Sequence, residues 1–267
     1  MDMIKHVNVL NISKKKIKMT TIKNIFIIFI FIFTGLIQAE TIRIMPLGDS
    51  LTYDWTFSEM ETPINDGYRY AYRYYLWHQL QNAQYDVDFV GSLIAGSAIV
   101  PAFDPDNEGY VGWTSIEIAN IIYAKLIENP ADIILLHIGT NDWSESTYGI
   151  NRILDEIDRY ETTYDHKITV VLARILNSPL NYAHLTNLNI NIQSLADTRI
   201  ANGDDIVVVD MENGAGINYS SDFQDSLHPN DMGYYKMANV WFSAIEEILN
   251  RGNDNYAWLI PIYGLIL

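Results

Sequence analysis

A serine follows a short apolar segment in the run Ile44–Tyr53, which reads Ile-Met-Pro-Leu-Gly-Asp-Ser-Leu-Thr-Tyr. Residues 41–45 are β-prone, and we expect a strand that stops at Pro46 before a Gly-Asp-Ser turn. A serine placed there exposes its hydroxyl at the carboxyl edge of a sheet, where open α/β sheets bind their ligands. Gly48 permits a tight turn, and Ser50 is the candidate nucleophile. Because Gly, Asp and Ser are common turn formers, an ordinary strand-ending turn is the alternative interpretation.

A carboxylate and an imidazole lie three residues apart in Asp225-Ser-Leu-His228-Pro229, just before a predicted helix. A carboxylate that close can hold one tautomer of the ring and stabilise its protonated form, which leaves the other ring nitrogen to accept a serine proton. Asp225 and His228 therefore complete a candidate set with Ser50. The remaining histidines lack such a local partner, and we interpret them as ordinary surface side chains. They are His6, His78, His137, His166 and His184.

Two further stretches offer hydrogen-bond donors for a negatively charged oxygen. Gly112 precedes Thr114, the predicted N-cap of a helix, and a free backbone N–H there could receive a developing oxyanion with help from the helix dipole. Asn141 follows the apolar run 132–137 and a glycine turn, and its carboxamide can donate two hydrogen bonds near Ser50. Each stretch, taken alone, is also typical of a simple turn.

Short apolar runs alternate with helical patterns along the chain. The runs are at 41–45, 87–90, 132–137, 168–173 and 206–209, and the predicted helices are at 68–82, 114–129, 149–162, 186–202 and 230–250. This alternation favours parallel strands joined by right-handed crossovers. We predict one three-layer α/β/α sandwich with a five-stranded parallel sheet over residues 40–252. Residues 92–113 show no sustained period, and we expect a long surface loop there.

The ends of the chain differ from the predicted domain. Residues 1–39 carry a lysine-rich stretch, the apolar run Ile25–Ile37 and a closing Gln38-Ala39, which together are typical of a secretory signal. The run is too short for a confident membrane span, and an uncleaved anchor is the alternative. We expect export to the periplasm or the outside of the cell. Residues 253–267 form an apolar tail, for which packing on the domain and contact with a lipid or a partner both stay open.

Composition limits the classes of partner. The 267 residues are 49% hydrophobic and include no cysteine, which excludes disulfides and thiolate metal sites. The formal net charge is −16, and beyond residue 39 there are 11 basic residues against 32 acidic ones. Such an acidic surface repels phosphate backbones, so we expect no nucleic-acid partner. Uncharged small-molecule or polysaccharide esters fit this surface, we expect no stable membrane span beyond the amino-terminal segment, and the oligomeric state stays open.

Taken together, the candidate motifs resemble a known superfamily. Gly48-Asp49-Ser50-Leu51, Gly112, Gly139-Thr140-Asn141-Asp142 and Asp225-x-x-His228-Pro229 stand in the order of the four blocks of the SGNH (GDSL) hydrolases. The resemblance covers about residues 40–250. Met45-Pro46-Leu47 before the first block, and Glu108-Gly-Tyr-x-Gly-Trp-Thr at the second, are similar to the acetylxylan-esterase-like carbohydrate esterases. Asp54 departs from the pattern, since relatives often carry Gly there.

The resemblance implies a flavodoxin-like sandwich and ester hydrolysis with no metal or other cofactor. Ser50 would attack the ester carbonyl, with His228 as general base and Asp225 as the group that orients it. The backbone N–H groups of Ser50 and Gly112, with the Asn141 side chain, would form the oxyanion hole. We expect a serine esterase that removes small acyl groups, acetyl foremost, from carbohydrate. The alternatives are a lysophospholipase or arylesterase of the same class, and a non-catalytic carbohydrate-binding module.

Five aromatic side chains lie in or near the predicted loops: Tyr53, Trp55, Tyr110, Trp113 and Trp143. Their flat faces suit stacking on sugar rings, which would support a carbohydrate substrate. Aromatic side chains also dominate protein cores, so packing in the interior is an equally good interpretation for each of them.

Overall fold

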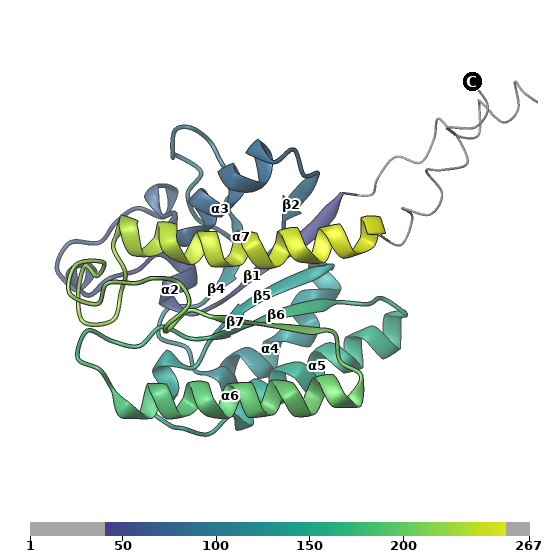
Figure 1. The fold of residues 1–267 in the computed structure, drawn as a ribbon. Helices are drawn as coiled ribbons and strands as arrows, with labels where there is room; N and C mark the ends of the chain where they lie inside the picture. The colour runs from purple at the N-terminus through teal and green to yellow at the C-terminus, as the bar shows by residue number, and fades with distance from the viewer. Residues whose placement is uncertain (1–40, 255–267) are drawn as a thin grey trace, which may run out of the picture. The chain divides into compact units, whose positions relative to one another are not determined.

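The computed structural model describes residues 41–254, in which helices cover both faces of a central sheet (Figure 1). The strands are β1 (Ile42–Gly48), β2 (Val87–Phe89), β3 (Leu93–Ile94), β4 (Asp106–Gly109), β5 (Ile133–His137), β6 (Thr169–Arg174) and β7 (Ile206–Asp210). The α-helices are α2 (Ser50–Tyr53), α3 (Ala71–Asn82), α4 (Ser115–Glu128), α5 (Tyr148–Tyr164), α6 (Ala183–Asn202) and α7 (Asp231–Asp254). Three 3-10 helices are η1 (Phe57–Met60), η2 (Asp66–Tyr68) and η3 (Thr140–Asp142).

Two predicted segments concern residues beyond this range. The signal segment at 1–39 lies outside the described residues, and so does the apolar tail from residue 255 onwards. Among residues 41–254, no helix combines the length and the apolar character needed to cross a bilayer.

The strands follow the order β3-β4-β1-β5-β6-β7 across the sheet, with β2 also paired to β1. One side of β1 pairs with β5 along Ile44–Gly48, and the other side is shared by β2, opposite Ile42–Ile44, and β4, opposite Leu47 and Gly48. All these pairings and those of β6 and β7 are parallel, and only the pairing of β3 with β4 is antiparallel. The predicted α/β/α class with a mostly parallel sheet is confirmed. The predicted count of five strands was wrong. The two additional strands, β3 and β4, lie in the segment 92–113 that was predicted as a loop.

β1 continues through Pro46, where the sequence predicted that it stops. Proline has no N–H to donate to a neighbouring strand, so it normally marks the end or the edge of a strand. Here β2 pairs no further than Ile44 and β4 begins to pair at Leu47, so Met45 and Pro46 face the break between these two partners. The missing N–H costs no ladder bond at that break, and the strand reaches Gly48.

The segment predicted as one long loop at 92–113 contains both β3 and β4. β4 reads Asp-Asn-Glu-Gly, a composition that is depleted in strands, which is why its sequence gave no strand signal. Asn107 and Glu108 are nevertheless fully buried. The Glu108 carboxylate accepts hydrogen bonds from the Ser92 backbone N–H and from the Tyr110 hydroxyl, so its burial is compensated.

Two apolar clusters lie on opposite faces of the sheet. The alternation of β1 sends Met45 and Leu47 into the cluster that contains buried residues of α4, α5 and α6, and sends Ile44 into the cluster with α3 and α7. Figure 1 shows the same division, with α3 and α7 on one face and α4, α5 and α6 on the other. On the α3/α7 face the fully buried rings of Tyr72 and Trp241 pack 5.8 Å apart. The strands that carry the candidate site are therefore held rigidly on both sides.

The interpretation of His137 as a surface side chain was wrong. It ends the central strand β5 and is fully buried, because helices cover both faces of that strand. Its Nε2 accepts a hydrogen bond from the Leu176 backbone N–H at 3.3 Å, and burial lowers its pKa to about 4. This ring is a neutral part of the core at ordinary pH. Of the other histidines, His6 lies outside the described residues, while His78, His166 and His184 are half-buried.

Candidate active site

The structure brings together three of the residues singled out from the sequence. Ser50 begins α2 directly after β1, and its Oγ lies 3.0 Å from Nε2 of His228. Nδ1 of the same ring lies 2.9 Å from Oδ1 and 2.8 Å from Oδ2 of Asp225, in the loop before α7. Ser50 is only 5% exposed and His228 only 2%. A hydroxyl, an imidazole and a carboxylate thus form one continuous, largely buried chain of hydrogen bonds.

The turn that presents Ser50 depends on close backbone packing. A Cβ added at Gly48 would lie 2.3 Å from the His137 carbonyl oxygen, so only glycine fits at this strand end. Asp49 caps α2, since its Oδ1 accepts the Leu51 backbone N–H at 3.0 Å. Asp49 is fully buried, and this burial raises its pKa to about 6.

The Asp225 carboxylate is held in its ionised form by several donors. Burial by itself would raise its pKa, but four N–H groups lower it to about 2: the His228 ring, and the backbone of Phe57, Leu227 and His228. An anion at this position favours a proton on Nδ1 of His228, because Nδ1 faces the carboxylate. Nε2 is then an acceptor facing Ser50. The site has the arrangement that a general base needs to take a proton from the hydroxyl.

Phe57 contacts the candidate site, although the sequence analysis did not single it out. Its backbone N–H donates to Asp225 Oδ2 at 2.9 Å, and its ring meets the His228 ring edge-on with centroids 5.0 Å apart. The ring of Trp55 also meets the His228 ring, at 5.6 Å. A capping box of Thr56 and Glu59 begins η1 at Phe57. That pattern was readable as a helix start, but a contact of a backbone N–H has no signature in the sequence.

A buried ion pair fixes the segment that carries Phe57. The Arg69 guanidinium donates to both Glu59 carboxylate oxygens, at 2.9 and 2.6 Å, and the two side chains are 7% and 1% exposed. Arg69 also donates to the Asp54 carbonyl oxygen at 2.6 Å and to Asp66 at 2.9 Å. The segment 54–69 is thereby tied to itself at several points, and the wall beside His228 is rigid.

Asp54 adopts the left-handed conformation, with φ 79° and ψ 67°. This backbone region favours glycine, which agrees with the glycine that the resemblance expects there, and Asp is among the residues that tolerate it best. The Asp54 carboxylate accepts the Tyr70 backbone N–H at 2.8 Å. The departure from the family pattern therefore serves the loop, and Asp54 takes no part in the hydrogen-bonded chain of Ser50.

The predicted oxyanion donors lie in two loops that are joined to each other. Gly112 lies in a turn in which the Trp113 N–H donates a hydrogen bond to the Tyr110 carbonyl oxygen at 3.2 Å. The φ of Gly112 is +76°, the value that a type II turn requires of its third residue. The Tyr110 N–H in turn donates to the Gly48 carbonyl oxygen at 2.9 Å, beside the Ser50 turn. Asn141 Nδ2 donates to the Trp113 carbonyl oxygen at 3.0 Å, which orients the carboxamide.

The helix α4 completes this junction. The capping box of Thr114 and Glu117 is present at its start. Asp142 in η3 accepts the Ser115 backbone N–H at 2.8 Å and the Ser115 hydroxyl at 2.5 Å. The loops that carry Gly112 and Asn141 are thus pinned to one helix N-terminus, at the carboxyl ends of β4 and β5. This is the edge of the sheet where Ser50 also lies.

A family model described as GDSL-like Lipase/Acylhydrolase matches residues 44–241. The chain belongs to this family. The match spans the segments that carry Ser50, Asp225 and His228, and it confirms the resemblance to the SGNH hydrolases and the prediction of a carboxylic ester hydrolase.

Relatives of this GDSL-family chain include esterases. A "Multidomain esterase" of Ruminococcus flavefaciens is 29% identical over 243 residues, which are 80% of this chain and 30% of that protein. The chain therefore spans about 30% of the length of that relative. The solved structure of a family 3 carbohydrate esterase of Clostridium thermocellum is 28% identical with a TM-score of 0.66, covering 79% of this chain and 98% of that one. A carbohydrate esterase family 3 structure from Talaromyces cellulolyticus, 23% identical with a TM-score of 0.65, shares the fold over 79% of this chain and 99% of that one.

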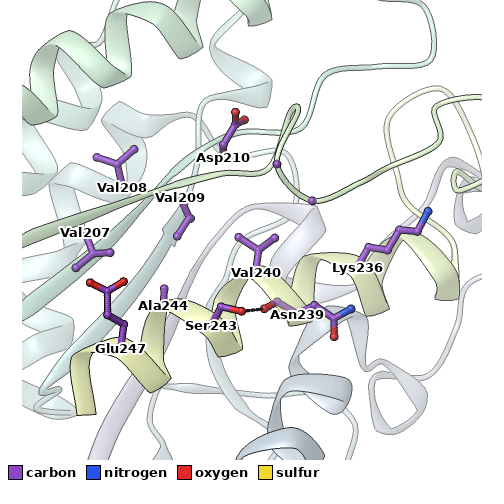
Figure 2. Close-up of a pocket in the computed structure, with 12 residues that line it drawn as sticks. Val207, Val208, Val209, Asp210, Lys236, Asn239, Val240, Ser243, Ala244 and Glu247 are labelled. Carbon is purple, nitrogen blue, oxygen red and sulfur yellow. Dashed lines mark hydrogen bonds between the residues drawn. The ribbon is translucent and has the colours of Figure 1, made fainter. Parts of the chain in front are cut away.

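A cavity of about 440 Å³ in the GDSL-family domain lies away from these residues, between β7 and α7 (Figure 2). Valines of both elements line it together with Asp210, Lys236 and Glu247, and it contains none of the residues discussed above. Among the described residues, no group of three or more histidines and carboxylates is arranged to hold a metal ion.

Proposed function

We propose that this chain is an exported serine esterase that hydrolyses small acyl esters of carbohydrate, acetyl esters foremost. The observation that carries the proposal is the hydrogen-bonded chain from Ser50 Oγ through the His228 ring to Asp225, with distances of 3.0 and 2.8 Å. Its geometry matches the roles that nucleophilic ester hydrolysis needs: a nucleophile, a base within hydrogen-bond reach and a group that orients the base.

In the first half of the reaction, Ser50 Oγ attacks the ester carbonyl while His228 Nε2 takes the hydroxyl proton. Negative charge develops on the carbonyl oxygen, where the backbone N–H groups of Ser50 and Gly112 and the Asn141 carboxamide would stabilise it. The C–O bond to the alcohol then breaks, and the proton on Nε2 passes to the leaving alkoxide. An acyl group remains on Ser50.

In the second half, water takes the place of the alcohol. His228 Nε2 removes one proton from the water as its oxygen attacks the acyl carbon, and the same donors stabilise the second tetrahedral intermediate. Ser50 leaves with the proton from Nε2, and the carboxylic acid is released. Asp225, ionised because its pKa lies at about 2, stabilises the imidazolium in both halves.

Three features support the choice of substrate and location. The relatives include a multidomain esterase and, at 28% identity, one family 3 carbohydrate esterase. The 33 acidic residues against 17 basic ones disfavour anionic substrates such as acidic phospholipids. The lysine-rich start and apolar run of residues 1–39 support export.

Substrate profiling of the full chain tests the proposal. We expect hydrolysis of acetylated xylan and of p-nitrophenyl acetate, with rates falling as the p-nitrophenyl acyl chain lengthens. Turnover of lysophosphatidylcholine that exceeds acetylated xylan by orders of magnitude would instead assign the chain to the lysophospholipase alternative.

A pair of serine variants tests the mechanism. Ser50→Ala should lose on the order of 10⁶-fold in kcat, whereas Ser97→Ala, at an exposed serine outside the site, should retain full activity. Unchanged hydrolysis by Ser50→Ala would exclude the mechanism. A purified wild-type chain that binds acetylated xylan but hydrolyses no ester would indicate the non-catalytic binding module.

A further inference from the structure

Trp143 combines two features that the fold does not need. Its side chain is 62% exposed, although burial of an indole is favourable. It also adopts the left-handed conformation, with φ 48° and ψ 35°, which costs a non-glycine residue on the order of 1–3 kcal/mol. Exposed apolar side chains and strained backbone each occur elsewhere in the structure, but their coincidence at one large aromatic residue indicates a role other than stability.

Trp143 belongs to a cluster of three rings, which we call the Trp143 platform. Its indole centroid lies 5.7 Å from the Tyr182 ring and 5.3 Å from the His184 ring. The rings of Tyr182 and His184 stack on each other at 5.4 Å with planes 27° apart. These two residues lie at the start of α6, so the platform joins the segment after η3 to a second element of the carboxyl edge.

The platform is fixed in place by polar contacts. The Glu145 side chain accepts a hydrogen bond from Asn187 at 2.8 Å, and the Glu145 backbone carbonyl accepts one from Asn191 at 2.8 Å. Both asparagines lie on α6, so the segment that follows Trp143 is held against that helix. An exposed ring held in this way is a preorganised binding surface, because little side-chain freedom is lost when a ligand settles on it.

Two links connect the platform to the candidate active site. Trp143 is two residues beyond Asn141, so their Cα atoms are at most about 7.6 Å apart along the chain. On the other side, the loop that leads into Tyr182 is tied to the catalytic loop, since Ser178 Oγ donates to the Ser226 carbonyl oxygen at 2.7 Å. A substrate whose ester carbonyl sits at Ser50 would therefore extend its neighbouring groups towards these rings.

Other aromatic side chains near the site are already engaged. Tyr110 and Trp113 stack on each other at 4.3 Å, Arg69 covers the ring of Tyr53 at 4.9 Å, and Trp55 packs on His228. Trp143 alone of the five aromatics named from the sequence has a mostly exposed ring. It is the residue of that set best placed to present a face to a ligand.

We propose that the Trp143 platform is a sugar-binding subsite, on which a pyranose ring of the alcohol part of the substrate stacks; this inference rests on the proposed carbohydrate esterase function. One face of a pyranose carries several C–H groups with a positive dipole end, which match the negative face of an aromatic ring. An acyl chain would be served by an enclosed groove rather than by a flat exposed ring. The platform thus selects the alcohol and leaves the acyl group to the Ser50 side.

The test compares two acetyl esters that differ in the alcohol. Acetylated xylo-oligosaccharide offers a pyranose ring, and ethyl acetate has no ring at all. In the full chain, Trp143→Ala should lower the ratio of kcat/KM for the oligosaccharide to that for ethyl acetate about two- to tenfold, the range expected for the loss of one aromatic contact. The change should lie mainly in KM, and Trp143→Phe should restore part of it.

Two controls separate binding from folding. Tyr164→Ala removes another half-exposed ring, at the far end of α5, and should leave the ratio unchanged. Trp143→Gly relieves the left-handed strain, which offsets the lost ring contacts, so its midpoint of thermal unfolding should stay close to that of the wild type while the ratio still falls.

Each remaining outcome has a defined meaning. Turnover of the oligosaccharide with an unchanged ratio in Trp143→Ala overturns the subsite and leaves the proposed function intact. Hydrolysis of ethyl acetate without turnover of any sugar ester contradicts the proposed substrate and the subsite with it. A fall in the ratio for p-nitrophenyl laurate to p-nitrophenyl acetate, with none for the sugar ester, would assign the platform to an acyl chain and overturn the inference.

Discussion

Replacing Phe57 with proline tests how far the Asp225 charge depends on one backbone N–H. Phe57 is the first residue of η1, where the N–H has no partner within the helix and donates instead to Asp225 Oδ2 at 2.9 Å. Proline suits this position, because a 3-10 helix already has φ near that of proline and Thr56 is extended at φ −136° and ψ 161°. The substitution should therefore delete a donor without rebuilding the loop.

The contact sets the expected magnitude. A hydrogen bond to a charged group contributes about 1.5–3 kcal/mol, and loss of this one weakens the hold of the Asp225 carboxylate on the imidazolium that forms in the transition state. Three other donors remain on the carboxylate: the backbone N–H groups of Leu227 and His228, and the His228 ring. We expect kcat/KM to fall roughly 10- to 100-fold.

The same change should be visible in the dependence of stability on pH. The pKa of Asp225 lies at about 2 in the folded chain, below its ordinary value of 3.8, so its contribution to stability is present above pH 3.8 and is lost as the pH falls through 2. Without the Phe57 N–H, the pKa moves back towards 3.8. The variant should therefore lose stability mainly near neutral pH and differ less from its control as the pH approaches 2.

Phe57→Ala is the matched control, because it removes the same ring but keeps the N–H. The assay is kcat/KM for p-nitrophenyl acetate, with thermal unfolding followed between pH 2 and pH 7, for both variants. If the proline and alanine variants have equal kcat/KM and parallel stability curves, the N–H of Phe57 does not sustain the Asp225 charge and the reasoning fails.

Two further predictions concern the oxyanion donors and the buried acid beside Ser50. Asn141→Ala should lower kcat for p-nitrophenyl acetate about 10²- to 10³-fold with a small change in KM; an equal effect on KM and none on kcat would show that the carboxamide acts on ground-state binding. Burial raises the pKa of Asp49 from 3.8 to about 6, so the folded chain keeps a proton that the unfolded chain releases, and stability falls by about 3 kcal/mol as the pH rises from 4 to above 6. Asp49→Asn cannot release this proton, so its thermal unfolding midpoint, relative to that of the wild type, should rise between pH 4 and pH 7. A difference between the two midpoints that stays constant across that range would contradict the assigned cause.

The parts of the fold that the sequence predicted well are those in which apolar side chains repeat. The apolar run at 132–137 and the N-cap Thr114 predict a strand and a helix start, and the structure contains both as β5 and α4. β4 was missed because Asn107 and Glu108 are polar and bind the backbone of Leu93 and Ser92, contacts that no local pattern reveals. Pro46 was misread because its tolerance depends on where β2 ends, a fact of the register and not of the strand itself.

In the candidate site, too, some residues could be predicted from the sequence and others could not. Ser50, Asp225 and His228 could be predicted as a set because their side-chain types suit the chemistry and two of them lie three residues apart, and the structure brings the three together. The contacts that hold them are mostly made by backbone atoms, such as the Phe57 N–H on Asp225 and the Ser226 carbonyl oxygen that accepts from Ser178. Backbone groups are the same in every residue, so only the fold shows which of them matter.

The ion pair between Arg69 and Glu59 has a consequence for how a substrate arrives. The two side chains are 7% and 1% exposed, so separating them would leave two unpaired charges in the protein interior. Opening the segment 54–69 would therefore cost a large free energy. The wall beside His228 is thus built before any ester is encountered. On this side of the site a substrate therefore docks onto a surface that is already formed, and no movement of the segment 54–69 limits the rate of association.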